Sequence, residues 1–145
     1  MAQSRDQFGL TIVRIALGVF FICEASEKLG WFLSSDELSQ QLGRFLTHAV
    51  PANRWYLERV AIPFAPIFAR LVVLGEASTG ISLILGAYTR LAATLALLMV
   101  LNFHFSSGAL FGGMSFLTNG YALPVLGGLL GLAVGGGRLP WSLKK

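Results

Sequence analysis

The feature that most constrains this 145-residue chain is a long stretch without charge, because residues 91–137 contain no Asp, Glu, Lys or Arg. These 47 residues are enough for two membrane-spanning helices and a turn, since one crossing takes about 20 residues. Only 12% of the chain is charged, about half the roughly 25% of a typical soluble domain, and the mean hydropathy is +0.68. We therefore exclude a soluble enzyme, a disordered tail and a collagen-like chain, and we predict an integral membrane protein.

Four apolar stretches predict four transmembrane helices, at residues 8–29, 61–87, 91–105 and 121–136. Pro63 and Pro66 fall in the first turns of the second stretch, where a missing N–H donor matters least. The third and fourth stretches are separated by a connection rich in Gly and Ser. The predicted fold is thus all-α, a polytopic four-helix membrane bundle that forms one domain over residues 1–145.

The first connection, about residues 30–59, predicts a short amphipathic helix. Ser34 followed by Asp36 and Glu37 is typical of a helix start, and Leu38 and Leu42 then fall on one helical face. We expect this helix either to lie in the headgroup region of the bilayer or to cover the bundle as a solvent-exposed cap. Aromatic residues typical of a membrane interface flank it, namely Trp31, Trp55 and Tyr56.

The basic residues indicate an orientation rather than a nucleic-acid partner, because they are scattered or stand at the ends of apolar stretches. With the N-terminus inside, the third connection on the outer side carries no Lys or Arg, which follows the positive-inside rule. We expect a protein of the cell (inner) membrane with both termini cytoplasmic. The inner basic residues are Arg5, Arg90, Arg138, Lys144 and Lys145, and those that oppose this orientation are Arg44, Arg54 and Arg59.

Ionisable side chains inside the spans need partners or water, since each charge at mid-bilayer costs about 2.5–3.5 kcal/mol on insertion scales. The positions of Arg14 and Glu76 along their helices allow an ion pair between them. Arg70 is about 120° from Glu76 around its helix and should face a different neighbour. Asn102 and His104 are about 160° apart, so we expect Asn102 to point inward and His104 to lie near the outer interface.

Two interpretations of these charges remain open. In the first, they are salt bridges that fix the helix register. In the second, they form a water-accessible pocket in the outer half of the bundle, able to hold a quinone head group or a small anion. In such a pocket Glu24 and Glu76 are the candidate catalytic carboxylates, which would relay the proton that quinone reduction requires. Arg70 and Asn102 would donate hydrogen bonds to the ligand, His104 is a further candidate, and the expected walls are Phe20, Phe21, Phe103 and Phe105.

The chain offers no redox group of its own. Its single cysteine, Cys23, excludes an internal disulfide and any multi-cysteine metal site, and His104 is the only span histidine, which disfavours a bis-histidine haem. We expect no covalently bound cofactor and no metal. Gly127, Gly131 and Gly135 repeat every four residues in the last stretch, a pattern that serves either packing within the chain or a homo-oligomer.

Three segments resemble the DoxX/DoxD family of four-helix membrane proteins: RIALG at 14–18 followed by Lys28 and Leu29, LGEASTG at 74–80, and LGAYTRLA at 85–92. The similarity covers nearly the whole chain, and its most specific part is the Gly-Glu…Thr-Arg stretch. The resemblance identifies Lys28, Glu76 and Arg90 with polar positions of the family, so Lys28 and Arg90 join the candidate ligand-binding residues.

Resemblance to the DoxD members implies the small membrane subunit of a thiosulfate:quinone oxidoreductase. Such a subunit works with a second protein and passes electrons to membrane quinone. We therefore expect a quinone-linked oxidoreductase subunit that acts with a partner enzyme. The alternative is a non-catalytic membrane anchor or assembly factor, in which the polar residues only hold the bundle together.

Overall fold

The computed structural model describes residues 2–143, which form helices joined by short connections, with no strand in that part of the chain. The all-α prediction is therefore confirmed for these residues. The principal helices are α1 (Ala2–Glu27), α4 (Ala65–Leu85), α5 (Thr89–Ser106) and α7 (Leu123–Gly135). Shorter helices join them: η1 (Leu29–Phe32), α2 (Asp36–Thr47), α3 (Pro51–Tyr56) and the π-helical η2 (Leu57–Ala61) before α4, and η3 (Ala109–Phe111) and α6 (Met114–Leu117) before α7.

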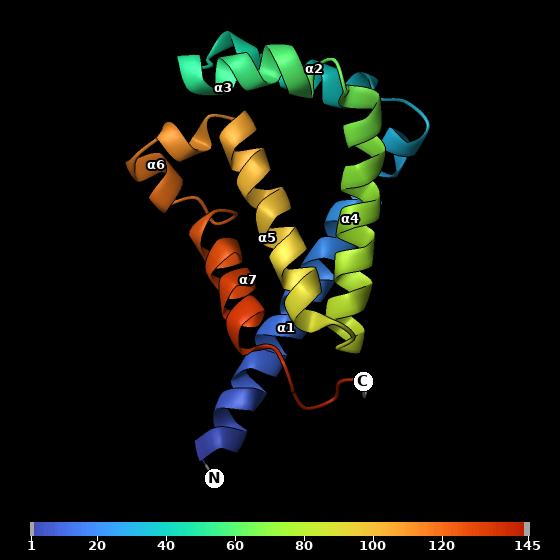
Figure 1. Ribbon diagram of the computed structural model, residues 1–145, viewed down its shortest axis with the longest axis vertical. Helices are drawn as coiled ribbons and strands as arrows, with labels where there is room; N and C mark the ends of the chain where they lie inside the picture. Colours follow the sequence, from blue (N-terminus) through green and yellow to red (C-terminus); the bar gives the residue numbers. More distant parts are fainter. Residues whose placement is uncertain (1, 144–145) are drawn as a thin grey trace.

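Three helices within residues 2–143 are long and apolar enough to cross a membrane: α1 from Arg5 onward, α4 and α5. They correspond to the first three predicted spans. The fourth predicted span, residues 121–136, contains α7, an apolar helix of only 13 residues. At 1.5 Å per residue α7 is about 20 Å long, less than the hydrocarbon thickness of about 30 Å. Figure 1 shows α7 running back toward the end of the bundle where α1 begins.

A tight turn after α4 makes α4 and α5 antiparallel neighbours. Gly86 ends α4 with a φ of 68°, in the left-handed region that favours glycine, and α5 begins at Thr89. Gly86 is also required by a close approach, because a Cβ at this position would overlap the guanidinium of Arg14. The family-like segment at 85–92 thus forms the turn between two candidate membrane spans.

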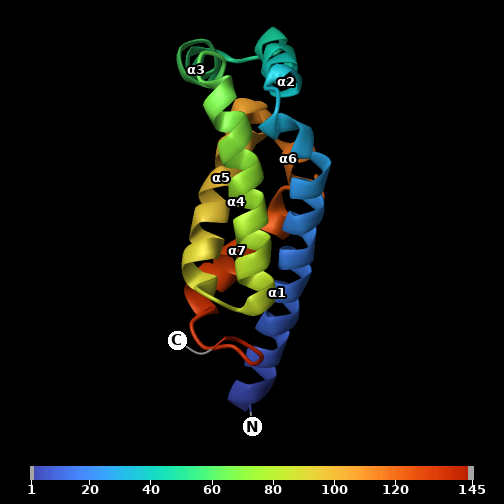
Figure 2. The same cartoon turned by 90° about the vertical axis from the view of Figure 1, so that its right-hand side faces the viewer.

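Close backbone contact joins α1 to α4, which lie side by side in Figure 2. A Cβ on Gly18 would come within 3.0 Å of the backbone N of Ile84, and a Cβ on Gly80 would come within 2.9 Å of the carbonyl oxygen of Gly18. Two of the family-like segments therefore meet here, where the absence of side chains lets the helices approach. On the opposite side of the bundle α5 packs against α7.

The predicted glycine seam of α7 has a different environment at each position. A Cβ on Gly127 or Gly131 would meet nothing within 4 Å, whereas one on Gly135 would come within 2.9 Å of Leu10 Cδ1 on α1. Of the three glycines, only Gly135 thus packs closely within the chain. Gly128, which was not part of the predicted seam, packs against Leu17 of α1 in the same way.

Helices α2 and α3 cover the end of the bundle away from the N-terminus and form a cap over it (Figure 1). The Ser34 hydroxyl accepts a hydrogen bond from the backbone N–H of Asp36 at 3.1 Å, at the start of α2. Leu38 and Leu42 are buried in a cluster with residues of η2 and α4. Of the two placements left open by the sequence, the structure thus favours a cap, because the apolar face of α2 covers protein.

Trp31 lies inside this cap and not at its surface. Its side chain is buried in the same cluster as Leu38, and its indole N–H donates a hydrogen bond to the Glu37 carboxylate at 2.8 Å. The expectation of a lipid-facing interfacial residue was therefore wrong for Trp31, since η1 turns the indole under α2. Trp55, by contrast, is largely exposed.

Arg14 does not pair with Glu76, and the ion pair allowed by the sequence is absent. The Arg14 side chain is fully buried, and its Nη2 donates to the carbonyl oxygens of Pro140 and Trp141, at 3.3 Å and 3.1 Å. The Arg14 guanidinium lies level with Gly86 at the end of α4. Gly86 is ten residues from Glu76, which is about 15 Å along that helix. The expectation failed because α1 begins several residues before the predicted span, which places Arg14 at a different height.

Candidate functional site

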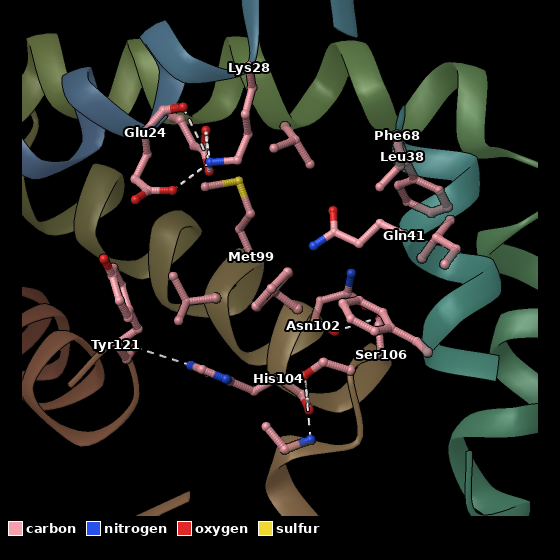
Figure 3. Close-up of a pocket in the computed structure, with 18 of the residues that line it drawn as sticks. Glu24, Lys28, Leu38, Gln41, Phe68, Met99, Asn102, His104, Ser106 and Tyr121 are labelled. Carbon is pink, nitrogen blue, oxygen red and sulfur yellow. Dashed lines mark hydrogen bonds and ion pairs between the residues drawn. The ribbon is translucent and has the colours of Figure 1, made fainter. Parts of the chain in front are cut away.

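A pocket of about 620 Å³ lies beneath the cap, between the ends of α1, α4 and α5. Most of its wall is apolar and aromatic, which is typical of sites for small organic ligands. Figure 3 shows Glu24 and Lys28 on one side of the pocket and Gln41 and Asn102 on the other. Side chains that line it include Phe20, Phe21, Trp31, Leu38, Phe45, Phe68, Met99, Phe103, His104 and Tyr121.

A group of three charged residues forms one polar side of the pocket. The Lys28 ammonium lies 2.6 Å from Oε2 of Glu24, one helical turn away, and 3.0 Å from Oε1 of Glu76 on α4. The Lys28–Glu24 pair has the i, i+4 order that the sequence shows, with the carboxylate first. The Lys28–Glu76 pair links two helices and could not be read from either helix alone. Two carboxylates and one ammonium give this group a formal charge of −1.

Amide and hydroxyl groups form the other polar side. Asn102 and Gln41 line the pocket. The hydroxyl of Ser106 donates a hydrogen bond to the backbone carbonyl oxygen of Asn102 at 2.8 Å. Asn53 of α3 is buried, and its side-chain amide donates to the carbonyl of Ser106 at 3.3 Å. Asn53 thus fixes the cap to the end of α5, directly beside the pocket.

His104 is buried, contrary to the expectation that it lies near the outer interface. It is 2% exposed, its Nε2 lies 3.2 Å from the carbonyl oxygen of Tyr121, and its ring packs against Phe116. Both His104 and Asn102 line the pocket, although they point in nearly opposite directions around α5. Both can do so because the cap and α4 lie on one side of α5 and the connection to α7 lies on the other.

The Nδ1 atom of His104 is buried and has no hydrogen-bond partner within residues 2–143. A buried polar atom without a partner costs about 1–3 kcal/mol, so a polar atom of a ligand or a water molecule at this place would stabilise the protein. This pocket residue is therefore suited to hydrogen bonding with a bound molecule.

Two of the predicted ligand-binding arginines lie outside the pocket. Arg70 is exposed, and its guanidinium donates to the carbonyl of Pro66 on its own helix, as its 120° separation from Glu76 leads one to expect. Arg90 lies at the opposite end of the bundle, where its Nε donates to the carbonyl of Ala133 on α7 at 3.0 Å. Of the predicted site residues, the structure brings together Glu24, Lys28, Glu76, Asn102 and His104.

The predicted aromatic walls are present except for one. Phe20, Phe21 and Phe103 line the pocket, whereas Phe105 lies behind the lining residue Tyr56 and packs against it and against Phe111. Sequence reasoning missed the cap residues Trp31 and Gln41, and also Tyr121. The amphipathic pattern of α2 predicted a buried face, but not that this face would cover a pocket.

A helical bundle with three helices long and apolar enough to cross a membrane, and with charged residues in a capped, largely apolar pocket, defines a class of small membrane proteins. A comparison with protein families identifies the particular family: the DoxX family model matches residues 9–109, so the chain belongs to the DoxX family. The matched region includes α4, α5 and the whole cap, and it ends before α7. No curated protein and no solved structure matches the chain.

Proposed function

We propose that this DoxX-family membrane protein binds the head group of a membrane quinone in the capped pocket and serves a partner enzyme as the membrane subunit of a quinone-linked oxidoreductase. The observation that carries the proposal is the pocket itself, which has apolar walls between two polar sides. A quinone head group is a flat apolar ring with carbonyl oxygens at opposite ends. A quinone head group therefore matches the shape and polarity of this pocket better than a uniformly polar solute does.

The charge of the pocket argues against the small anion that the sequence left as an alternative ligand. Glu24 and Glu76 outnumber Lys28, which already contacts both carboxylates. Arg70, the cation expected to attract an anion, is exposed on the outside. An anion would thus meet net negative charge in a low-dielectric site, whereas a neutral quinone would not.

In the proposed complex the residues of this chain would bind the quinone and handle protons. The Asn102 amide would donate a hydrogen bond to one carbonyl oxygen. The Lys28 ammonium, on the opposite side of the pocket (Figure 3), would stabilise the other carbonyl oxygen by its charge, because its three N–H donors are already directed to Glu24 and Glu76. Reduction of a quinone to a quinol takes two electrons and two protons. The partner enzyme would supply the electrons, with sulfur compounds as candidate donors, and Glu24 and Glu76 would relay protons for the reduction.

We also propose that α7 and the residues before it make the fourth crossing, with both termini on the cytoplasmic side of the inner membrane. Figure 1 supports an even number of crossings, because the two ends of the described part of the chain lie at the same end of the bundle. Arg5, Arg90 and Arg138 are exposed at or near this end. Lys144 and Lys145, which also favoured this orientation, lie outside the described residues.

Quinone binding to the purified protein in lipid nanodiscs tests the proposal. We expect Glu76→Gln and Asn102→Leu each to weaken binding of a ubiquinone or menaquinone analogue at least about tenfold, or about 1.4 kcal/mol. Arg70→Ala is the matched control, since Arg70 lies on the same helix as Glu76 but outside the pocket, and it should bind like wild type. Thermal unfolding of each variant separates loss of binding from loss of folded protein.

The outcome that would contradict quinone binding is also informative. If wild type binds neither quinone while Glu76→Gln merely unfolds, the charged residues hold the bundle together and the pocket is not a quinone site. The remaining function is then that of a non-catalytic anchor or assembly factor. Such a protein should co-purify with its partner enzyme, and cap variants should lose the partner.

A further inference from the structure

The helix contacts around the pocket are uneven. α1 packs closely along α4, and α5 packs along α7, but α1 meets α7 over a shorter stretch. That stretch lies toward the N-terminal end of α1, where Leu10 and Leu17 face Gly135 and Gly128. Because α7 begins only at Leu123, α7 does not cover this side of α1 at the level of the pocket.

One aromatic contact bridges this place. The rings of Phe20 on α1 and Tyr121, two residues before α7, lie with their centroids 5.9 Å apart. Both side chains also line the pocket. Phe20 is half-buried and Tyr121 is 61% exposed, so the pocket reaches the surface here behind two side chains. We call this place the Phe20–Tyr121 seam.

The surface beside the seam has the character of a surface in contact with lipid. The connection from α5 to α7 carries no charged residue, and Met114 and Leu117 of α6 are exposed, Met114 at 72%. Phe111 of η3 is also largely exposed. Figure 1 shows α6 at the side of the bundle, below the level of the cap. Exposed apolar side chains without charged neighbours are costly in water and favourable in a bilayer.

Two other boundaries of the pocket, at the cap and along α1 and α4, are closed by packed elements. α2 and η2 cover it from the cap, with Leu38, Leu42 and Leu57 buried, and Phe45 of α2 packs against Phe103 of α5. α1 and α4 meet through their glycines along their shared face. At the seam, in contrast, Figure 3 shows the Tyr121 ring at the margin of the pocket, directed toward the side where Glu24 lies.

We infer that the Phe20–Tyr121 seam is a lateral portal, through which a lipid-soluble quinone passes its head group from the bilayer into the pocket while its isoprenoid tail stays in the seam. This inference rests on the proposed quinone binding and adds the route and the chemical class of the substrate, a long-tailed quinone and not a water-soluble one. The two aromatic rings would pack against the tail and exclude water. A side chain can change rotamer to open the seam without movement of a helix.

Closing the seam by cross-linking tests the inference. Phe20→Cys and Tyr121→Cys are combined in a Cys23→Ser background, because Cys23 is exposed and would react as well, and a bifunctional thiol reagent then joins the two cysteines in nanodiscs. The probes are a long-tailed ubiquinone and menaquinone and their tail-less analogues. Leu10→Cys with Gly135→Cys is the matched control, since it cross-links α1 to α7 at the packed part of the same interface.

Cross-linking the seam should slow binding of the long-tailed quinones at least about tenfold relative to the same protein before cross-linking, and the tail-less analogues should keep their affinity. The control cross-link should change neither the binding rate of the long-tailed quinones nor the affinity of the tail-less analogues. If long-tailed quinones bind the cross-linked seam at an unchanged rate, the portal lies elsewhere and the inference is wrong, although quinone binding stands. If the protein binds no quinone before cross-linking, the proposed function fails and the inference fails with it.

Discussion

The Lys28 ammonium lies 3.0 Å from the Glu76 carboxylate, and this contact joins the end of α1 to the middle of α4 beside a pocket. Both side chains are mostly buried, and the Lys28 ammonium also contacts Glu24, so the loss of Lys28 leaves two carboxylates without this cation in a low-dielectric site. We predict that Lys28→Met destabilises the protein by about 2–4 kcal/mol, toward the value for breaking a buried pair.

A double-mutant cycle checks this prediction. Lys28→Met, Glu76→Gln and the double variant are compared in thermal or denaturant unfolding in detergent. Because Glu76→Gln removes one of the two carboxylate charges that Lys28→Met leaves without the ammonium, the double variant should be more stable than the sum of the single effects predicts. Additive effects would show that the two side chains do not interact in solution.

A second prediction concerns the attachment of the cap. Asn53→Leu removes the hydrogen bond to the Ser106 carbonyl and should weaken the contact of α3 with α5 by about 1–2 kcal/mol. Hydrogen exchange of the α2 and α3 amides should then be faster, while exchange in α4 stays unchanged. Ser39→Ala, an α2 variant outside the pocket, is the control. Equal protection of the cap in Asn53→Leu and wild type would contradict the prediction.

Larger side chains in place of the glycines of the α1–α4 interface should destabilise the protein, whereas the same replacement on the open face of α7 should not. Gly80→Val would bring a side chain against Ile22 and the backbone of Gly18, and we expect a loss of about 1–3 kcal/mol, as is typical of overpacking. Gly127→Val, at a position with open space, should leave the melting temperature of the monomer unchanged. A dimer that dissociates in Gly127→Val would instead assign that open face to a homo-oligomer.

The buried Arg14 should control the C-terminal segment. Arg14→Leu removes the donors to the carbonyls of Pro140 and Trp141, so this segment should detach, and the backbone around the exposed Arg138 should become free to enter the trypsin active site. We expect cleavage after Arg138 to be about tenfold faster than in wild type, since a loss of about 1.4 kcal/mol in the attachment of the segment raises its open fraction tenfold. Arg90→Gln, near the same end, is the control. An unchanged cleavage rate would mean that other contacts hold the segment.

Much of the helical architecture could be predicted from the sequence because lipid imposes length and polarity on each span. The charge-free stretch gave α5 and α7, and the amphipathic pattern after Ser34 gave α2. The length of α7 was overestimated, since the predicted boundaries followed hydropathy alone, and Pro124 starts the helix only at Leu123.

The site was predictable only where its members share a helix. Glu24 and Lys28 are one turn apart, and their pairing follows from spacing. The Lys28–Glu76 contact depends on how far α1 extends relative to α4, which no single helix reveals. The predicted Arg14–Glu76 pair was wrong for the same reason, because the sequence does not show how high α1 stands relative to α4. Nor does the hydropathy pattern of α5 show which of its faces the cap covers and which the connection to α7 covers.

The partners of Arg14 also have a consequence for how the protein is made. The guanidinium bonds to carbonyls 126 and 127 residues further along the chain. A chain that leaves the ribosome from its N-terminus therefore delivers α1 to the membrane long before these carbonyls exist. Until Pro140 and Trp141 have been made, α1 must keep its arginine near water or lipid phosphates, so the burial of Arg14 is completed by residues synthesised much later.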